Sequence, residues 1–137
     1  MGAHAMAEIE QNEAPEPAPA SILAVIPTLN EERHIETCIR SLMRGDARLR
    51  DIPLVVADGG STDKTVEIVE HLKSEFPNLQ LIHNPKRLQA AAMNLAVLDA
   101  STPVTQYVVR CDAHSIYPAD FILSVAKALE ALSLIHI

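Results

Sequence analysis

Apolar and polar positions alternate along the chain with two different periods. Four short apolar runs have the composition of buried strands, and each is followed by a segment in which apolar residues recur at helical spacing. The expected strands cover residues 22–26, 52–57, 79–83 and 104–110. The expected helices start near Asn30, Lys64, Leu88 and Pro118. This alternation predicts an α/β fold with a mostly parallel sheet, right-handed crossovers and flanking helices.

Residues at the ends of the expected helices support this pattern. Asn30 is a favoured N-cap, and Glu31 and Glu32 place negative charge in the first turn, where the helix dipole stabilises it. Gly45 is expected to end the same helix. Pro118 stands at a first helical position that proline favours. These residues therefore predict where the first helix begins and ends and where the fourth begins.

The two ends of the chain differ in composition from the part between them. Residues 1–20 contain four glutamates among alanine and proline and no lysine or arginine, which predicts a disordered tail. Residues 132–137 (LSLIHI) end the chain without a capping glycine or polar tail, and a commonly used transposon-end adaptor encodes this hexapeptide in one frame. We therefore expect one domain over residues 21–131, truncated at its C-terminus and followed by adaptor-derived residues.

Composition and charge narrow the class of protein. With 137 residues and 48% apolar content, the chain is long enough for one domain with a core. The formal net charge of -7 argues against nucleic-acid binding, because no basic stripe is present to displace phosphate counterions. No signal peptide, run of membrane-spanning length or Cys-x-x-Cys motif occurs. A cytoplasmic protein with reduced thiols is expected, with Cys38 on the buried face of the first helix.

Polar, acidic segments follow three of the expected strands. The first strand leads into residues 27–32 (PTLNEE), the second into 58–63 (DGGSTD) and the fourth into 111–114 (CDAH). Because the carboxyl ends of parallel strands share one edge of the sheet, we expect these carboxylates to converge on one ligand site. Two local roles stay open, namely Asp58 shaping its glycine turn and Asp63 capping the next helix. The chain has neither a Gly-x-Gly-x-x-Gly motif nor a P-loop.

Four segments, taken in order, resemble the successive motifs of one enzyme family. They are residues 26–32 (IPTLNEE), 58–63 (DGGSTD), 84–94 (NPKRLQAAAMN) and 110–118 (RCDAHSIYP). Together they resemble the family 2 inverting glycosyltransferases with the GT-A fold, over about residues 21–132. Within that family the chain looks most similar to the β-glucosyltransferases of succinoglycan biosynthesis in bacterial exopolysaccharide pathways. The resemblance implies a Rossmann-like sheet that binds a nucleotide-sugar.

The resemblance implies that residues after the first two strands hold the nucleotide. Pro27 and Thr28 would line the nucleobase pocket, Glu31 would lie near the ribose, and Asp58 would accept the uracil N3 hydrogen. A carboxylate suits that role because a charge-assisted hydrogen bond is about twice as strong as a neutral one. Many relatives have an aromatic residue where this chain has Leu29, so stacking worth about 1–3 kcal/mol per base would be lost. For Glu31, a charge that serves only the helix dipole is the alternative.

The resemblance also implies a divalent metal, bound by Asp112 and His114 at the family's Asp-x-Asp positions. A cation there would stabilise the departing nucleoside diphosphate, which Asp112 would also help to bind. One oxygen and one nitrogen ligand favour Mn²⁺ over Mg²⁺, and a turn or capping role is the alternative. Lys86 and Arg87 would hold the pyrophosphate or form a solvated basic pair. Three other histidines are expected on the surface or at a strand end: His34, His71 and His83.

The expected activity follows from the same resemblance. It is transfer of a hexose from a UDP-sugar, with UDP-glucose as the expected donor, to a saccharide or lipid-linked acceptor in exopolysaccharide or cell-surface glycan synthesis. In the resembled family the general base and the acceptor-binding residues follow the region where this chain stops. The base is therefore expected beyond Ile137, and the 137-residue chain is expected to be inactive alone. Association with the cytoplasmic face of the membrane would also come from that later part.

Three other classes of protein share part of this pattern. A receiver-like or phosphatase-like domain places carboxylates at strand ends, but it needs an acidic cluster after the first strand, which here is followed by PTLN. A sugar-nucleotide pyrophosphorylase usually opens with a glycine-rich phosphate loop, which this chain lacks. A non-catalytic nucleotide-sugar-binding module stays open as an alternative, because it would need the same donor site.

Overall fold

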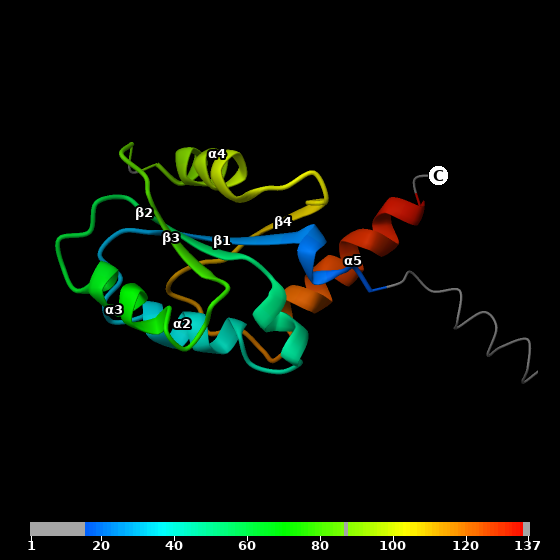
Figure 1. Cartoon of the computed structure of the whole chain (residues 1–137), viewed down its shortest axis with the longest axis horizontal. Helices are drawn as coiled ribbons and strands as arrows, with labels where there is room; N and C mark the ends of the chain where they lie inside the picture. Colours follow the sequence, from blue (N-terminus) through cyan, green and yellow to red (C-terminus); the bar gives the residue numbers. More distant parts are fainter. Residues whose placement is uncertain (1–15, 87, 136–137) are drawn as a thin grey trace, which may run out of the picture.

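The computed structural model describes residues 16–86 and 88–135, and it contains one four-stranded sheet between helices (Figure 1). The strands are β1 (Ile22–Thr28), β2 (Leu54–Asp58), β3 (Leu79–His83) and β4 (Tyr107–Arg110). Their order in the sheet is β3-β2-β1-β4, and each neighbouring pair is parallel. The predicted α/β fold with a mostly parallel sheet is therefore confirmed.

Helices cover both faces of this sheet. The α-helices are α2 (Ile35–Leu42), α3 (Thr65–Leu72), α4 (Gln89–Ala100) and α5 (Phe121–Ile135), and the 3₁₀ helices are η1 (Pro19–Ser21) and η2 (Ala47–Asp51). Figure 1 shows α4 on one face and α2 with α3 on the other. None of the helices in the described ranges is both long enough and apolar enough to cross a membrane.

The central strand β1 is buried on both faces, which explains why its sequence is a nearly continuous apolar run. Ile22 and Ile26 face the larger core, to which α2, α3 and α5 contribute. Leu23 and Val25 face a smaller core, which includes residues of β2 and α4. Because successive side chains of a strand point to opposite faces, this one strand joins both helical layers to the sheet.

The first helix begins later than the sequence predicted. Asn30 does not cap it, because Asn30 has a left-handed backbone conformation (φ 52°) and lies in the loop before the helix. The helix α2 starts at Ile35 instead. It ends at Leu42, before Gly45, whose φ of 125° belongs to the following turn. The predicted buried position of Cys38 on this helix is confirmed, since its side chain is fully buried.

The fourth strand and fourth helix are also shorter at their starts than predicted. β4 begins at Tyr107, not at residue 104, because the Thr105 N–H donates to the carbonyl of Thr102 in a turn. Pro118 lies ahead of α5, which begins at Phe121. In both places a local turn replaces the regular element that the sequence pattern indicated.

The predicted ends of the domain are described in part. Residues 1–15 of the expected tail and residues 136–137 lie outside the described residues, whereas residues 19–21 form η1. The helix α5 continues to Ile135 and so includes residues 132–135. Their origin as adaptor-derived residues stays a prediction, because a helical backbone is compatible with either origin.

Gly45 and Asp120 connect the end of α2 to the start of α5. The Asp120 N–H donates to the carbonyl of Arg44 at 3.0 Å, and its Oδ1 accepts from the Asp46 N–H at 2.7 Å. A Cβ atom at Gly45 would lie 2.2 Å from Oδ1 of Asp120, so the approach requires glycine. This contact holds the loop between β4 and α5, which forms one wall of the site described below.

Candidate functional site

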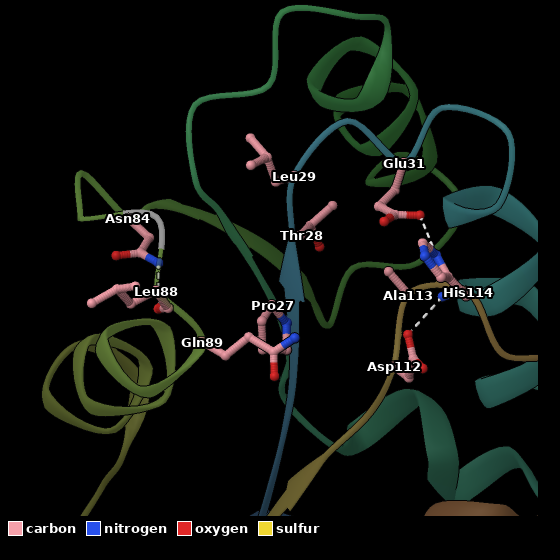
Figure 2. A pocket seen from close by; sticks show the side chains of 10 residues that line it. All are labelled: Pro27, Thr28, Leu29, Glu31, Asn84, Leu88, Gln89, Asp112, Ala113 and His114. Atoms are coloured by element: carbon pink, nitrogen blue, oxygen red, sulfur yellow. Dashed lines mark hydrogen bonds and ion pairs between the residues drawn. The ribbon is translucent and has the colours of Figure 1, made fainter.

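A cavity of about 260 Å³ opens at the carboxyl ends of β1 and β4. The sheet order places β2 and β3 on one side of β1 and β4 on the other, so the loops that follow β1 and β4 diverge here. Open α/β sheets bind ligands at such a point. Figure 2 shows the residues that line the cavity: Pro27, Thr28, Leu29, Glu31, Asn84, Leu88, Gln89, Asp112, Ala113 and His114.

The end of β1 forms the wall at which the sequence predicted a nucleobase pocket. Pro27 and Thr28 line the cavity there. Thr28 is buried, and its hydroxyl donates to the carbonyl of Ile26 at 2.9 Å, which fixes the side chain. Leu29 is 38% exposed and presents an apolar surface to the cavity. Contact of these residues with a base stays a prediction.

Asn30 joins the loop after β1 to the loop after β2. Its backbone N–H donates to the Ser61 hydroxyl at 2.8 Å, and its Oδ1 accepts from the Thr62 N–H at 2.8 Å. Both contacts depend on the left-handed conformation of Asn30, which asparagine tolerates better than most residues. The two loops therefore behave as one support for the cavity wall.

Asp58 turns its carboxylate into its own loop. Oδ2 accepts from the backbone N–H groups of Gly60 and Ser61 at 3.0 and 2.9 Å, and Oδ1 accepts from the Ser61 hydroxyl. Asp58 is buried and does not line the cavity. The observed contacts match the turn-shaping role, and base recognition by Asp58 stays a prediction. Asp63 is not the N-cap of α3, which is Lys64, but its Oδ1 accepts from the Thr65 N–H at 2.9 Å and so fixes the turn that leads into the helix.

Glu31 directs its carboxylate towards the imidazole of His114, with 2.6 Å between Oε2 and Nδ1 (Figure 2). The Glu31 N–H donates to the Thr65 hydroxyl at 2.8 Å, which fixes the residue between two loops. Oε2 is buried and accepts no hydrogen bond from the described residues, so its contact with His114 is close but not a directed hydrogen bond. A buried acceptor without a donor costs free energy, and a cation beside it would remove that cost.

His34 brings a third metal-ligating side chain to the same place. One ligand atom each of Glu31, His34 and His114 lies within 4.8 Å of the other two. The rings of His34 and His114 have their centroids 5.2 Å apart. His34 is exposed, as the sequence predicted. Its position beside Glu31 and His114 was not predicted. The available signal was the Glu-x-x-His spacing of Glu31 and His34, which occurs in carboxylate metal proteins.

Asp112 lines the cavity but does not belong to this three-residue group. Its Oδ1 accepts from the His114 N–H at 3.0 Å, and its own N–H donates to the Tyr117 hydroxyl at 2.6 Å. These contacts are those of a turn, the alternative that the sequence left open. Asp112 therefore positions His114, and its predicted role as a metal ligand stays a prediction.

The helix α4 begins at the cavity. Leu88 and Gln89 line it, and the Asn84 side-chain amide donates to the carbonyl of Leu88 at 3.0 Å. The unpaired N–H groups at a helix start favour an anion. Lys86 lies in a separate groove beside α4 and is not brought to the cavity. Arg87, its predicted partner in binding pyrophosphate, lies outside the described residues.

The cavity wall is acidic. Glu31 and Asp112 contribute carboxylates, and none of the lysines and arginines that the structure describes lines the cavity. Beneath the wall, the thiol of Cys38 donates to the carbonyl of Asp112 at 3.4 Å. Burial raises the pKa of Cys38 to about 12, and the negative charges of Asp112 and Glu31 act in the same direction. A diphosphate entering this cavity would meet negative charge unless a cation accompanied it.

Comparison with known proteins identifies the family. The chain belongs to glycosyl transferase family 2, whose model matches residues 23–135. It is 46% identical over 101 residues to the succinoglycan biosynthesis protein ExoA of Rhizobium meliloti (strain 1021), which covers 74% of this chain and 30% of that protein. The chain spans 30%, 31% and 30% of the lengths of the curated relatives that it matches.

Solved structures confirm the same fold. The mannosyltransferase PcManGT from Pyrobaculum calidifontis, in complex with GDP-Man and Mn²⁺, matches with a TM-score of 0.68 and 27% identity, over 95% of this chain and 38% of that one. TarS 1-349 of S. aureus, in complex with UDP, matches with a TM-score of 0.55 and 26% identity, over 69% of this chain and 27% of that one. These neighbours confirm the predicted GT-A-like fold of the chain.

Two variants of Asn30 should separate its backbone role from its side-chain role. Asn30→Gly keeps access to φ 52° but removes the bond to Thr62, so it should cost about 1 kcal/mol in free energy of unfolding. Asn30→Ala should cost about 1–2 kcal/mol more, because alanine disfavours the left-handed conformation. Denaturant unfolding measures both. Equal stability of the two variants would contradict the backbone role.

The raised thiol pKa values predict that stability falls at high pH. Burial raises the pKa of both Cys38 and Cys111 to about 12, so the native state keeps protons that the unfolded state loses above about pH 9. The free energy of unfolding should therefore fall between about pH 9 and about pH 12, by about 1 kcal/mol per pH unit for each thiol. Cys38→Ala should show a shallower slope in denaturant unfolding, while exposed Ser101→Ala should not. An unchanged slope in Cys38→Ala would count against the raised pKa.

Proposed function

We propose that the protein containing this chain is an inverting, metal-dependent glycosyltransferase that transfers a hexose from a UDP-sugar, with UDP-glucose as the first candidate, to a saccharide or lipid-linked acceptor. The observation that supports this most is the place of the cavity. The chain belongs to family 2, and its cavity lies at the point where the order of the strands in the sheet reverses. Residues from three of the four family-like motifs line that cavity. Identity to a succinoglycan biosynthesis protein supports a role in exopolysaccharide or cell-surface glycan synthesis. Action at the cytoplasmic face of the membrane is part of the same proposal.

The base and ribose are proposed to bind at the end of β1. Pro27, Thr28 and Leu29 would contact the base, and Glu31 lies further along the same wall, where the ribose would follow. Asp58 would accept the uracil N3 hydrogen through Oδ1, which accepts one hydrogen bond in the structure although a carboxylate oxygen can accept two. This contact requires the base to reach past the residues that line the cavity, because Asp58 is buried beside it. The UDP complex of TarS, at 26% identity, supports a uridine nucleotide.

The diphosphate is proposed to lie between the start of α4 and the loop after β4. The helix start offers N–H groups at Leu88 and Gln89, but the opposite wall carries the carboxylates of Glu31 and Asp112. A divalent cation near Asp112 and His114 would offset that charge and, when bound, would stabilise the departing UDP as a Lewis acid. Mn²⁺ is proposed over Mg²⁺ because a histidine nitrogen is a better ligand for Mn²⁺. The Mn²⁺ complex of PcManGT supports this choice.

The proposed reaction is a single displacement with inversion. The acceptor oxygen bonds to the anomeric carbon from the face opposite the nucleotide, and the bond between that carbon and the UDP oxygen breaks with its electron pair leaving on UDP. The proton of the acceptor hydroxyl passes to a general base. We assign no described residue as that base and propose that it lies beyond Ile137. The described residues would hold the donor and exclude water from it.

Calorimetric titration of the 137-residue chain with UDP tests the donor site. We expect UDP to bind in Mn²⁺ and its affinity to fall by at least about tenfold, or about 1.4 kcal/mol, when a chelator removes the metal. CDP serves as the control nucleotide and should bind more weakly, because cytosine N3 carries no hydrogen that Asp58 could accept. Absence of UDP binding in the presence of Mn²⁺ would overturn the proposal. Sugar transfer is then measured on a protein that extends past Ile137, where we place the general base, and transfer by that protein separates an enzyme from a non-catalytic binding module.

Asp58→Asn tests recognition of uracil without removing the turn. The amide keeps an oxygen for the N–H groups of Gly60 and Ser61 but replaces one acceptor by a donor. We expect the variant to lose about 1.5–3 kcal/mol of UDP binding and to discriminate less against CDP. Asp63→Asn, which alters the carboxylate that accepts from the Thr65 N–H in the same loop, is the matched control. UDP affinity that survives in Asp58→Asn would assign Asp58 to the turn alone.

A further inference from the structure

We infer that Glu31, His34 and His114 form a three-ligand centre that binds one divalent transition-metal ion in the absence of nucleotide. The inference assigns a ligand set that differs from the proposed pair of Asp112 and His114. Binding of the ion does not depend on the proposed function. Only the statement that the bound ion faces a diphosphate rests on it.

The ligand atoms are already close enough to share an ion. Atoms bound at about 2.0–2.2 Å to one ion lie within about 4.4 Å of each other. The three atoms here lie within 4.8 Å of one another, and Oε2 of Glu31 is 2.6 Å from Nδ1 of His114. His34 is exposed, so a small side-chain rotation can close the remaining difference. Oε2 of Glu31 and Nδ1 of His114 also have to separate by a few tenths of an ångström or more to bind one ion at these distances, and His114 is exposed enough to make that movement.

The carboxylate of Glu31 provides an independent reason for a cation. The side chain is 13% exposed, and Oε2 is buried without a hydrogen-bond donor among the described residues. Burying an ionised carboxylate oxygen without a donor costs free energy, which positive charge beside it would offset. None of the lysines and arginines that the structure describes lines the cavity, so the two imidazoles and a metal are the available partners.

The loops that hold the three ligands are fixed by hydrogen bonds that do not involve the ligand atoms. The Glu31 N–H donates to the Thr65 hydroxyl at 2.8 Å, and the His34 N–H donates to the Glu31 carbonyl at 3.0 Å. The His114 N–H donates to Oδ1 of Asp112 at 3.0 Å. Ligands oriented by such surrounding bonds need little reorganisation when a metal binds. Asp112 is thus a positioning residue for this centre.

The composition of the centre determines which ions it selects. Two imidazole nitrogens and one carboxylate oxygen suit Zn²⁺, Co²⁺ and Mn²⁺, whereas Mg²⁺ prefers an all-oxygen shell. Three protein ligands leave coordination positions open, as in catalytic rather than structural metal sites. Glu31 and His114 both line the cavity, so the open positions would face the place proposed for the diphosphate. His34 is what makes the centre rich in nitrogen.

Cobalt titration of the 137-residue chain without nucleotide tests the inference, because Co²⁺ absorbs visible light in a manner that depends on its ligands. We expect one equivalent of Co²⁺ to bind, Zn²⁺ to displace it, Mn²⁺ to displace it only in large excess, and excess Mg²⁺ not to displace it. His34→Ala and the isosteric Glu31→Gln should each weaken binding by at least about tenfold and change the spectrum. His71→Ala, which removes an exposed histidine of α3, is the matched control and should bind as the unaltered chain does.

The variants distinguish this centre from the proposed pair. If His34→Ala keeps the affinity and spectrum of the unaltered chain while Asp112→Ala loses both, the inference is overturned and the proposed pair holds the ion. If the chain binds Co²⁺ through His34 but does not bind UDP in Mn²⁺, the inference stands and the proposed function fails. Circular dichroism of each variant serves as the control, because it distinguishes a loss of metal binding from a loss of fold.

Discussion

The site exists because β1 extends beyond the strand on one of its edges. The last pair between β1 and β4 is Val25 with Arg110, whereas pairing with β2 continues to Thr28 and Asp58. Past Val25, the chain after β4 separates from β1 and leaves space at that edge. The cavity fills this space, with the end of β1 as one wall and the loop after β4 as the other. Parallel pairing of unequal length thus determines where a ligand can enter.

The electrostatics of the cavity follow from the same arrangement. One side begins with the helix α4, whose first N–H groups favour negative charge, and the other side presents two carboxylates. A ligand with both an anionic group and an associated cation matches these two sides better than either ion alone. The hydroxyls of Ser61 and Thr65 neutralise no charge, but they hold the loop that carries Glu31 in place. Among the residues that the structure describes, histidine is therefore the only source of positive charge at the cavity wall, and further positive charge would come with the ligand.

How far the sequence predicted the structure depends on the range of the interactions involved. The strands β1 and β2 were found because their burial leaves apolar runs, and the turn at Asp63 was found because its contact with Thr65 is local. Asn30 was misplaced because asparagine also favours the left-handed conformation, and its partner Thr62 lies in another loop. His34 was missed for a similar reason, since the sheet alone brings His114 beside it.

The contact of Gly45 with Asp120 has a consequence for how this protein can change over generations. Position 45 excludes a larger residue for two reasons, because its φ of 125° strains any side chain and because the added carbon would meet that oxygen. Loss of the carboxylate at position 120 would remove the second reason only, and it would free the Asp46 N–H and loosen the loop beside the cavity. Glycine at position 45 is thus expected to persist among descendants of this chain as long as this turn is kept. Gly45 and Asp120 do not line the cavity, but their presence in a related protein would then indicate that the site is still in use.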